Sequence, residues 1–284
     1  MQTFFNQAAL SYNGNTVLSN IVQGELIEVL SAAKTATADS YEPGETVTYA
    51  VSIVNSGTAP YNSITITDDL GAFEFNGATL FPLDYIEGSA RLFVNGILQT
   101  TPAVEAGPPL VINGVNIPAG GNAVLVYSVT VNSFAPLGSG ASVTNTATLS
   151  GAGIVTPVTA EETLPVSEET ELTITKSLNP TSVPENGRLT YTFVISNYGA
   201  TDAVTTDNLV VTDTFDPILN ALTVNYNGTA WVENSEYTYD ETTGRFATVE
   251  GQITVPAATY TQDSVTGEWI ITPGRSVITV TGNV

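Results

Sequence analysis

The chain has only two lysines, and both occupy the same place in an internal repeat. Lys34 opens the segment KTATADSYEPGETVTYAVSIVNSG, and Lys176 opens KSLNPTSVPENGRLTYTFVISNYG. A tyrosine and then an asparagine follow each lysine at identical spacings in the two copies. Self-similarity over this length predicts two copies of one domain.

Residue alternation indicates which way each lysine points. Successive side chains of a β-strand face opposite sides of the sheet, so residues two apart share a face. Both lysines share their faces with apolar residues: Leu30, Ala32 and Ala36 beside Lys34, and Leu172, Ile174 and Leu178 beside Lys176. The pattern therefore predicts two amines that point into a core.

In each copy an aspartate and an asparagine also share a strand face with apolar residues. The aspartates are Asp68 in ITITDDL and Asp213 in LVVTDTF. The asparagines are Asn145 in VTNTATLS and Asn6 in FFNQAALS. Each copy is thus expected to place a lysine, an aspartate and an asparagine toward its interior.

Buried charged groups must be paired, neutralised or used in chemistry. This arrangement resembles the autocatalytic isopeptide sites of Gram-positive pilin and adhesin sandwiches. There a buried neutral lysine attacks an asparagine, ammonia leaves, and a protonated carboxyl group shuttles protons. The expected bonds join Lys34 to Asn145 with Asp68 inside domain one, and Lys176 to Asn6 of a neighbouring subunit with Asp213.

Two other interpretations of these residues stay open. Each lysine and aspartate can form a buried ion pair with the asparagine as hydrogen-bond partner, which adds little net stability. The asparagine can instead satisfy backbone groups at a bulge. Glu45 and Asp69 are alternatives to Asp68 as the acid.

The composition excludes several classes of binding partner and catalytic site. The 284 residues carry a net charge of −22. A surface with this charge repels nucleic acid and anionic membranes. Because the chain has no Cys and no His, thiolate or imidazole metal sites and Ser–His or Cys–His nucleophiles are excluded. No apolar run is long enough to span a membrane, and MQTFFNQAAL lacks the features of a secretory signal.

Composition predicts an all-β protein, and the remaining repeat matches extend the two copies of one domain along the chain. Val, Ile, Thr and Tyr are abundant, and frequent Gly and Pro residues separate short strands. LFVNG matches VNYNG, and IPAGGNAVLVYSVTV matches ITPGRSVITVTGNV. The expected divisions are an N-terminal donor strand at 1–23, a first domain at 24–168 and a second domain at 169–284.

The two copies differ at their ends. After Val131 the first copy continues through VTNTATLS, whereas the second copy has no such continuation, and its counterpart FFNQAALS opens the chain. Residues 1–22 are therefore expected to complete the second domain of a neighbouring subunit, head to tail. The expected donor interface comprises Phe4, Phe5, Asn6, Ala8, Leu10 and Tyr12.

The repeat resembles the bacterial surface-repeat family called domain of unknown function 11. The resemblance rests on KTA…YEPGETVTYAVSIVNSG, ITITD and TNTAT in the first copy; the second copy departs from it at its PENG turn. It implies tandem immunoglobulin-like sandwiches on a cell surface and a structural or adhesive role. We therefore expect a self-assembling filament subunit, a homopolymer that is extracellular, on a cell or spore surface.

Other functions are secondary hypotheses. In one competing interpretation, the chain is a module of a longer adhesin repeat array. This module would bind carbohydrate through the aromatic residues Trp231, Trp269, Tyr237, Tyr239 and Tyr260. The acidic turns TDDLG, TDAVTTDN and YDETTG supply oxygen ligands for calcium, but none has the spacing of a known calcium loop. No cofactor and no metal site are therefore assigned. Catalysis is the least favoured class, since carboxylates without fixed spacing do not specify an enzyme.

Overall fold

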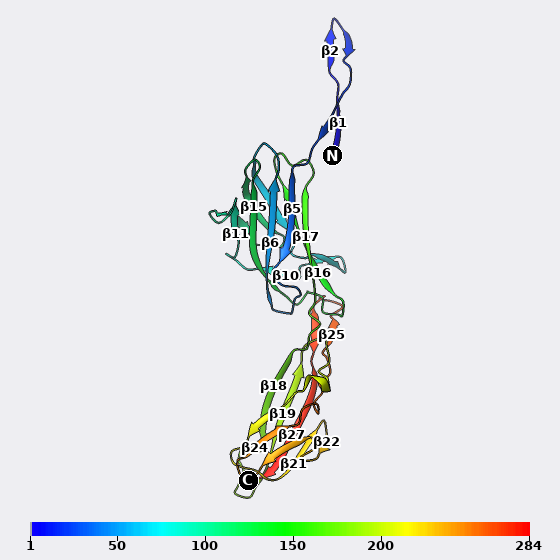
Figure 1. Ribbon diagram of the computed structural model, residues 1–284. Coiled ribbons are helices and arrows are strands. Elements are labelled where there is room, and N and C mark those ends of the chain that lie inside the picture. Colours follow the sequence, from blue (N-terminus) through cyan, green and yellow to red (C-terminus); the bar gives the residue numbers. More distant parts are fainter. Residues whose placement is uncertain (1) are drawn as a thin grey trace. The chain divides into compact units, whose positions relative to one another are not determined.

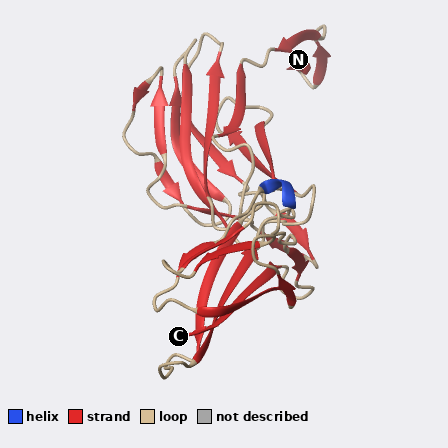
Figure 2. Cartoon of the chain, turned by 60° about the horizontal axis from the view of Figure 1, so that its bottom comes forward, coloured by secondary structure: helices blue, strands red, loops and turns tan. Residues whose placement is uncertain are grey.

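The computed structural model describes residues 2–284, which form strands, turns and one short 3-10 helix, η1 (Thr205–Asp207). Figure 2 shows strands throughout the chain. The residues divide into two compact units. Unit 1 comprises residues 2–132 and 143–164, and unit 2 comprises residues 133–142 and 165–284. The loop 133–142, which the sequence division places inside the first domain, groups with unit 2.

Unit 1 contains two main antiparallel sheets (Figure 1). The first has the order β12-β11-β15-β6-β5, with β10 also paired to β15, and the second has the order β13-β14-β7-β16-β17. The first sheet is built from β5 (Leu30–Ala36), β6 (Thr46–Asn55), β10 (Leu83–Tyr85), β11 (Arg91–Val94), β12 (Ile97–Leu98) and β15 (Asn122–Val131). The second is built from β7 (Tyr61–Asp68), β13 (Ala103–Glu105), β14 (Leu110–Ile117), β16 (Ser142–Ser150) and β17 (Val158–Pro165). A small hairpin joins β8 (Phe73–Phe75) to β9 (Ala78–Leu80).

Strict alternation builds the core of unit 1. Along β6 the residues Val47, Tyr49, Val51 and Ile53 are fully buried, while the residues between them face outward. β16 alternates in the same way, with Val143, Asn145, Ala147 and Leu149 buried. One apolar face per strand packs against the other sheet, which is the arrangement of a β-sandwich.

Unit 2 repeats the first of these sheets. Its order β18-β19-β27-β21-β22 corresponds to β5-β6-β15-β11-β12. These strands are β18 (Leu172–Asn179), β19 (Arg188–Asn197), β21 (Asn220–Tyr226), β22 (Thr229–Trp231) and β27 (Gly274–Asn283). Smaller sheets join β20 (Thr212–Thr214), β24 (Arg245–Thr248) and β23 (Tyr237–Asp240), and separately β25 (Thr259–Gln262) and β26 (Trp269–Thr272).

The correspondence extends to single side chains. Asn55 at the end of β6 accepts a hydrogen bond from the backbone of Gly57 and donates to Ala59. Asn197 at the end of β19 makes the same pair of bonds two and four residues on, to Gly199 and Thr201. The two asparagines therefore shape the same turn in the two units.

The two units differ at the strand that carries the aspartate. In unit 1, β7 lies between β14 and β16, and β17 follows β16. In unit 2, β20 pairs only with β24, and no described residue of the unit supplies a counterpart of β16 or β17. Unit 2 therefore has an unpaired sheet edge where unit 1 has two strands.

Residues 2–26 form a two-stranded ribbon, not the single strand that the sequence suggests. β1 (Gln2–Asn6) pairs with β4 (Val22–Leu26), and β2 (Ala9–Tyr12) pairs with β3 (Asn15–Leu18). Asn13 and Gly14 both have positive φ in the connecting turn, as a two-residue hairpin turn requires. This ribbon, residues 2–26, repeats the pairing of β16 with β17.

Candidate functional site

Lys34 lies in a sealed polar cluster at the centre of unit 1. Its Nζ atom donates a hydrogen bond to Oδ2 of Asp68 over 2.6 Å, and neither side chain is appreciably exposed. β5 supplies the lysine and β7 supplies the aspartate, so the pair bridges the two sheets of the sandwich. The amine also lies over the rings of Tyr49 and Tyr127, 4.8 Å and 5.9 Å from their centroids.

Tyr127 connects this ion pair to the asparagine. Its hydroxyl donates a short hydrogen bond to Oδ2 of Asp68 and accepts one from Nδ2 of Asn145 over 3.5 Å. Oδ1 of Asn145 is buried without a hydrogen-bond partner. Since a buried unsatisfied acceptor is costly, this carbonyl oxygen calls for an explanation.

The electrostatics of the cluster follow from its burial. Burial lowers the pKa of Lys34 below its ordinary value of 10.5, while the charge of Asp68 and its hydrogen bond act in the opposite direction. Burial also raises the pKa of Tyr127 well above 10.0, and the negative charge of Asp68 adds to that effect. Burial thus makes the charged amine less stable than in water, and it keeps the phenol protonated.

Unit 2 contains the same pair in an open setting. Lys176 on β18 contacts Oδ2 of Asp213 on β20, but 39% of the lysine side chain and 18% of the aspartate side chain are exposed. Nζ of Lys176 lies 4.4 Å from the ring centroid of Tyr191, with Phe193 and Phe215 nearby. Three aromatic rings therefore form an apolar wall beside an amine that is not covered.

The neighbours of Lys176 share its exposure. Leu172 and Ile174 lie on the same face of β18 and are 36% and 54% exposed, whereas Leu30, the counterpart of Leu172, is buried. A groove of about 320 Å³ opens beside Leu172 and Leu209. The face of β18 that carries Lys176 is therefore exposed, although the corresponding residues Leu30 and Lys34 of β5 are buried.

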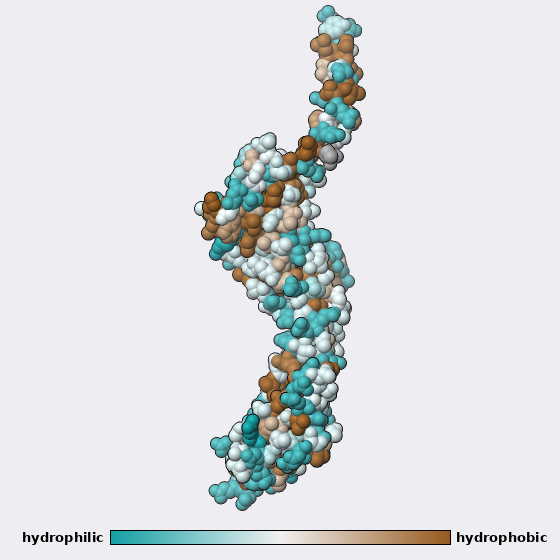
Figure 3. Space-filling model, in the orientation of Figure 1, coloured by the Kyte–Doolittle hydropathy of each residue, from teal (hydrophilic) through white to brown (hydrophobic). Residues whose placement is uncertain are grey.

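The ribbon exposes the residues that the sequence assigns to a donor. Residues 3–23 are all exposed, including Phe4, Asn6 and Leu10. Figure 3 shows hydrophobic side chains on the surface of the ribbon. Phe4 lies across from Gly24, where a Cβ would meet its ring, so the two strands pack closely. Asn6 belongs to unit 1 and Lys176 belongs to unit 2.

The structure also places the alternative acids. Asp69 accepts hydrogen bonds from the backbone of Gly71 and Thr146, and Glu45 accepts one from the backbone of Glu42. Glu45 thus serves a local turn, Asp69 joins its own turn to β16, and Asp68 is the carboxylate that contacts Lys34. The sequence interpretation missed Tyr127, because only the order of strands in the sheet reveals that its hydroxyl reaches Asp68.

The aromatic residues proposed for carbohydrate binding do not form an exposed platform. Tyr237 is buried and packs on Phe246, and the other four are half-buried. Trp231 stacks on Tyr226 with ring centroids 4.9 Å apart. These rings serve packing within unit 2.

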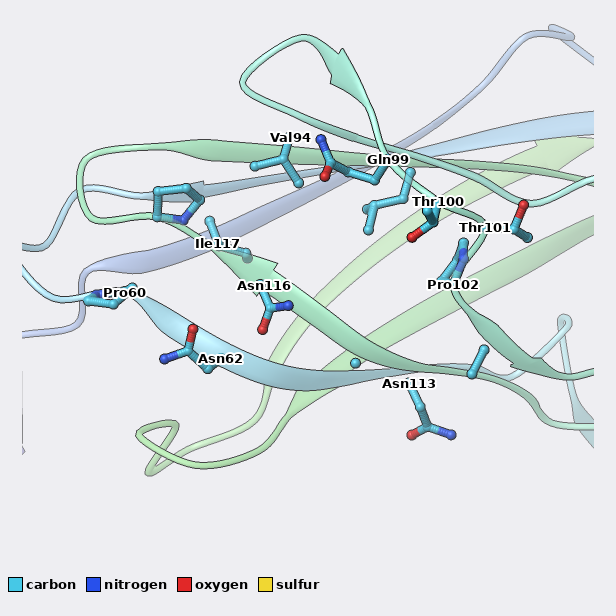
Figure 4. Close-up of a pocket in the computed structure, with 14 residues that line it drawn as sticks. Pro60, Asn62, Val94, Gln99, Thr100, Thr101, Pro102, Asn113, Asn116 and Ile117 are labelled. Atoms are coloured by element: carbon cyan, nitrogen blue, oxygen red, sulfur yellow. The ribbon is translucent and has the colours of Figure 1, made fainter.

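A separate cleft of about 520 Å³ lies in unit 1 (Figure 4). Amide side chains of Asn62, Asn113 and Asn116 line it together with Pro60 and Pro102. None of its lining residues is titratable or aromatic. The cleft therefore offers neither a general acid or base nor a stacking surface for a sugar.

Residues 2–284 contain no group of three or more acidic side chains placed to hold a metal ion. Within the same range, no helix is long and apolar enough to cross a membrane.

Comparison with known proteins finds matches only among solved structures, at low sequence identity. No family model matches the chain, and no curated protein matches it. The full-length RrgB pilus protein from Streptococcus pneumoniae is 13% identical, with 89% of this chain and 41% of that chain covered and a TM-score of 0.35. A collagen-binding domain from a Staphylococcus aureus adhesin is 13% identical, with 47% and 96% covered and a TM-score of 0.31. A family 123 glycoside hydrolase from Clostridium perfringens is 12% identical, with 49% and 27% covered and a TM-score of 0.31. This chain thus spans about a quarter of the hydrolase and less than half of RrgB.

Proposed function

We propose that this protein is a self-assembling structural subunit of an extracellular fibre, on a cell or spore surface. The ribbon of one subunit completes unit 2 of the next subunit, head to tail. Membership of the surface-repeat family called domain of unknown function 11 is part of this proposal. One observation carries it: the Lys–Asp pair is sealed in unit 1 and open in unit 2, and the exposed ribbon carries the matching asparagine.

Unit 1 serves as the template for the docked state. β16 and β17 cover Lys34 there, and the segment NTATLS of β16 matches NQAALS of the ribbon. Because Ala147 lies opposite Asp68, the same register places Ala8 opposite Asp213. The ribbon then adds two strands to the free edge of β20, and Asn6 takes the place that Asn145 occupies in unit 1.

Docking removes apolar surface on both partners from water. Phe4 and Leu10 of the ribbon, and Leu172 and Ile174 of unit 2, are exposed in the single chain. Each such side chain contributes roughly 1.5–3 kcal/mol when it is fully buried. Since donor and acceptor lie on different surfaces of one chain, the contact is heterologous and propagates as a filament unless it closes into a ring.

The docked site then has the groups for a covalent lock. Lys176 loses its exposure, and the rings of Tyr191, Phe193 and Phe215 already line one side. Burial favours the neutral amine, which attacks Cγ of Asn6 of the neighbour and releases ammonia, with Asp213 carrying the proton.

A mixture of two variants tests this proposal. Asn6→Ala cannot donate its side chain to the bond, and Lys176→Ala cannot accept one. In denaturing gels each variant alone should run as a monomer, wild type should form a ladder, and the mixture should stop at a dimer. Asn20→Ala, on the same ribbon, is the matched control and should form the wild-type ladder.

Electron microscopy of the undenatured samples separates docking from ligation. Both single variants should still form filaments, whereas a chain that lacks residues 2–26 should not. Filaments formed without the ribbon would overturn donor-strand assembly. A wild-type protein that stays monomeric at every concentration would support the competing interpretation, a module of a longer adhesin array.

A further inference from the structure

Docking covers only one face of the ribbon. We infer that the other face binds the outer face of β11 and β12 in a second copy of the chain, in a neighbouring fibre, so that fibres associate side by side. The inference rests on the proposed function, because the ribbon must be docked on unit 2 for one of its faces to be covered. It adds a lateral partner to the head-to-tail one.

Alternation and register identify the face that stays uncovered. Phe4 and Asn6 lie on one side of β1, and Phe5 lies on the other. In the register that unit 1 provides, Asn6 corresponds to the buried Asn145. Phe5 then corresponds to Thr144, which is exposed. Docking therefore buries Phe4 and leaves Phe5 in contact with water.

The uncovered face is more apolar than its counterpart in unit 1. Where β16 has the hydroxyl of Thr144, the ribbon has the ring of Phe5, which is 66% exposed. Ala9 lies on the same face as Phe5, and Leu18, opposite Ala9, is 60% exposed. We call Phe5 and Leu18 the ribbon patch. Large apolar side chains on the surface of a chain with a net charge of −22 mark an interaction site.

The first sheet of unit 1 offers a surface that is nearly free of negative charge. Its strands β5, β6, β11, β12 and β15 contain none of the 28 acidic residues of the chain. The short strand β10 adds only Asp84. Another copy of this acidic chain can therefore approach the outer face of this sheet with little repulsion between carboxylates.

The hairpin of β11 and β12 supplies apolar contacts on that face. Because Leu92 between them is buried, Arg91 and Phe93 face outward. Leu98 lies opposite Phe93 and is 57% exposed. Figure 3 shows hydrophobic side chains on the surface at this hairpin. We call Arg91, Phe93 and Leu98 the hairpin patch; aromatic residues and arginine are the types enriched in protein interfaces.

Opposite charges lie beside the aromatic rings of the two patches. Glu25 is exposed and lies opposite Thr3, on the same face of the ribbon as Phe5. Within residues 2–284 neither Glu25 nor Arg91 forms an ion pair, and Arg91 donates hydrogen bonds to backbone carbonyl groups. Diagonal neighbours on paired strands, such as Phe5 and Glu25, are about 7–8 Å apart, and residues two apart on one strand, such as Arg91 and Phe93, are about 7 Å apart. Contact between the two rings therefore brings Glu25 beside Arg91.

These charges favour ribbon-to-hairpin contact over contact between like patches. Two ribbon patches would place Glu25 against Glu25, and two hairpin patches would place Arg91 against Arg91, whereas one of each pairs opposite charges. The contact is heterologous, so it leaves a free patch of each kind on both partners. Since every subunit of a fibre repeats both patches, many such contacts act together between two fibres.

Two adjacent phenylalanines separate lateral contact from assembly. Phe5→Thr installs the residue that unit 1 has at this position, and its filaments should form as in wild type but stay single. Phe4→Thr, on the covered face, should reduce filament formation itself. Electron microscopy measures filament number and bundle width, and wild-type filaments should form bundles.

The outcomes distinguish the lateral contact from the proposed function. Wild-type filaments that stay single at every protein concentration, or Phe5→Thr filaments that bundle like wild type, would overturn the lateral contact and leave head-to-tail assembly intact. A wild-type protein that forms no filaments would overturn both.

Charge exchange tests the pairing of Glu25 with Arg91. Glu25→Arg and Arg91→Glu each place like charges face to face and should lower the bundled fraction severalfold in a low-speed sedimentation assay. The double variant restores opposite charges and should bundle as wild type does. The control Glu28→Arg, also at an exposed residue, changes the net charge as Glu25→Arg does and should not affect bundling. A double variant that bundles no better than either single variant would overturn the pairing.

Discussion

Lys34 and Lys176 occupy the same position in two copies of one fold, yet the first is sealed and the second is open. Each contacts an aspartate of the facing sheet, but the side chain of Lys34 is fully buried while 39% of the Lys176 side chain is exposed. The difference follows from β16 and β17, which unit 1 has and which the described residues of unit 2 lack. In the proposed assembly, docking must therefore precede the burial of Lys176, and burial must precede ligation.

The first prediction concerns the reactivity of the two lysines. In the ribbon-deleted chain, an amine-specific acetylating reagent should modify Lys176 and leave Lys34 untouched, because reagent and water reach only the open site. In assembled wild-type protein both lysines should be protected. Peptide mass spectrometry measures each site, and equal modification of Lys176 before and after assembly would contradict its burial by the ribbon.

The second prediction concerns the register of docking. Thr148 lies opposite Thr67 in unit 1, so Ala9 of the ribbon should lie opposite Thr212 of the neighbour. Since the chain has no cysteine, the double variant Ala9→Cys with Thr212→Cys should form only intersubunit disulfides under mild oxidation. Ala9→Cys with Thr214→Cys, two residues out of register, is the control. Preferential cross-linking of the control pair would show that the register is wrong.

The third prediction separates folding from assembly with one substitution at two matched leucines. Leu149 is fully buried in β16, and Leu10, its counterpart in the ribbon, is 66% exposed. Leu149→Ala should lower the free energy of unfolding of unit 1 by about 2–5 kcal/mol, because it leaves a cavity in a packed core. Leu10→Ala should leave the melting of the single chain unchanged and raise the concentration needed for filament growth. Equal assembly by Leu10→Ala and wild type would remove Leu10 from the interface.

The fourth prediction concerns alkaline pH. Burial raises the pKa of Tyr41, Tyr49 and Tyr127 above the ordinary value of 10.0. Below pH 10 these phenols are protonated in both states and do not affect stability. Above pH 10 the unfolded chain releases protons that the folded chain retains, so stability should fall as pH rises. Ultraviolet titration should show these tyrosines ionising only with unfolding, and their ionisation in the folded protein would contradict their burial.

Much of the fold and of the candidate site is readable in the sequence. Alternation places Lys34, Asp68 and Asn145 on apolar strand faces, and all three side chains are buried. The repeat spacing pairs Lys176 with Asp213, and the structure brings them into contact. These predictions succeed because strand alternation is local: a residue's neighbours two positions away reveal which face is apolar.

The sequence contains a turn signal in residues 2–26 that the prediction of a single donor strand did not use. Asn13-Gly14 lies between two apolar stretches and is a strong hairpin signal, so residues 2–26 fold back on themselves. The match of NQAALS to NTATLS concerns only the first strand of the ribbon. Residues 15–26, which form its second strand, correspond to β17, so the repeat includes both strands of the ribbon.

Local patterns in the amino-acid sequence predict the β-strand content, the repeat and the strand faces of Lys34, Asp68 and Asn145. The folded structure shows which lysine is buried, and that the hydroxyl of Tyr127 joins Asp68 to Asn145. Exposure and cross-sheet contacts depend on which strands lie side by side and which sheet covers them. Those choices join residues far apart in the chain, so no local pattern around Lys34 or Lys176 distinguishes the sealed site from the open one.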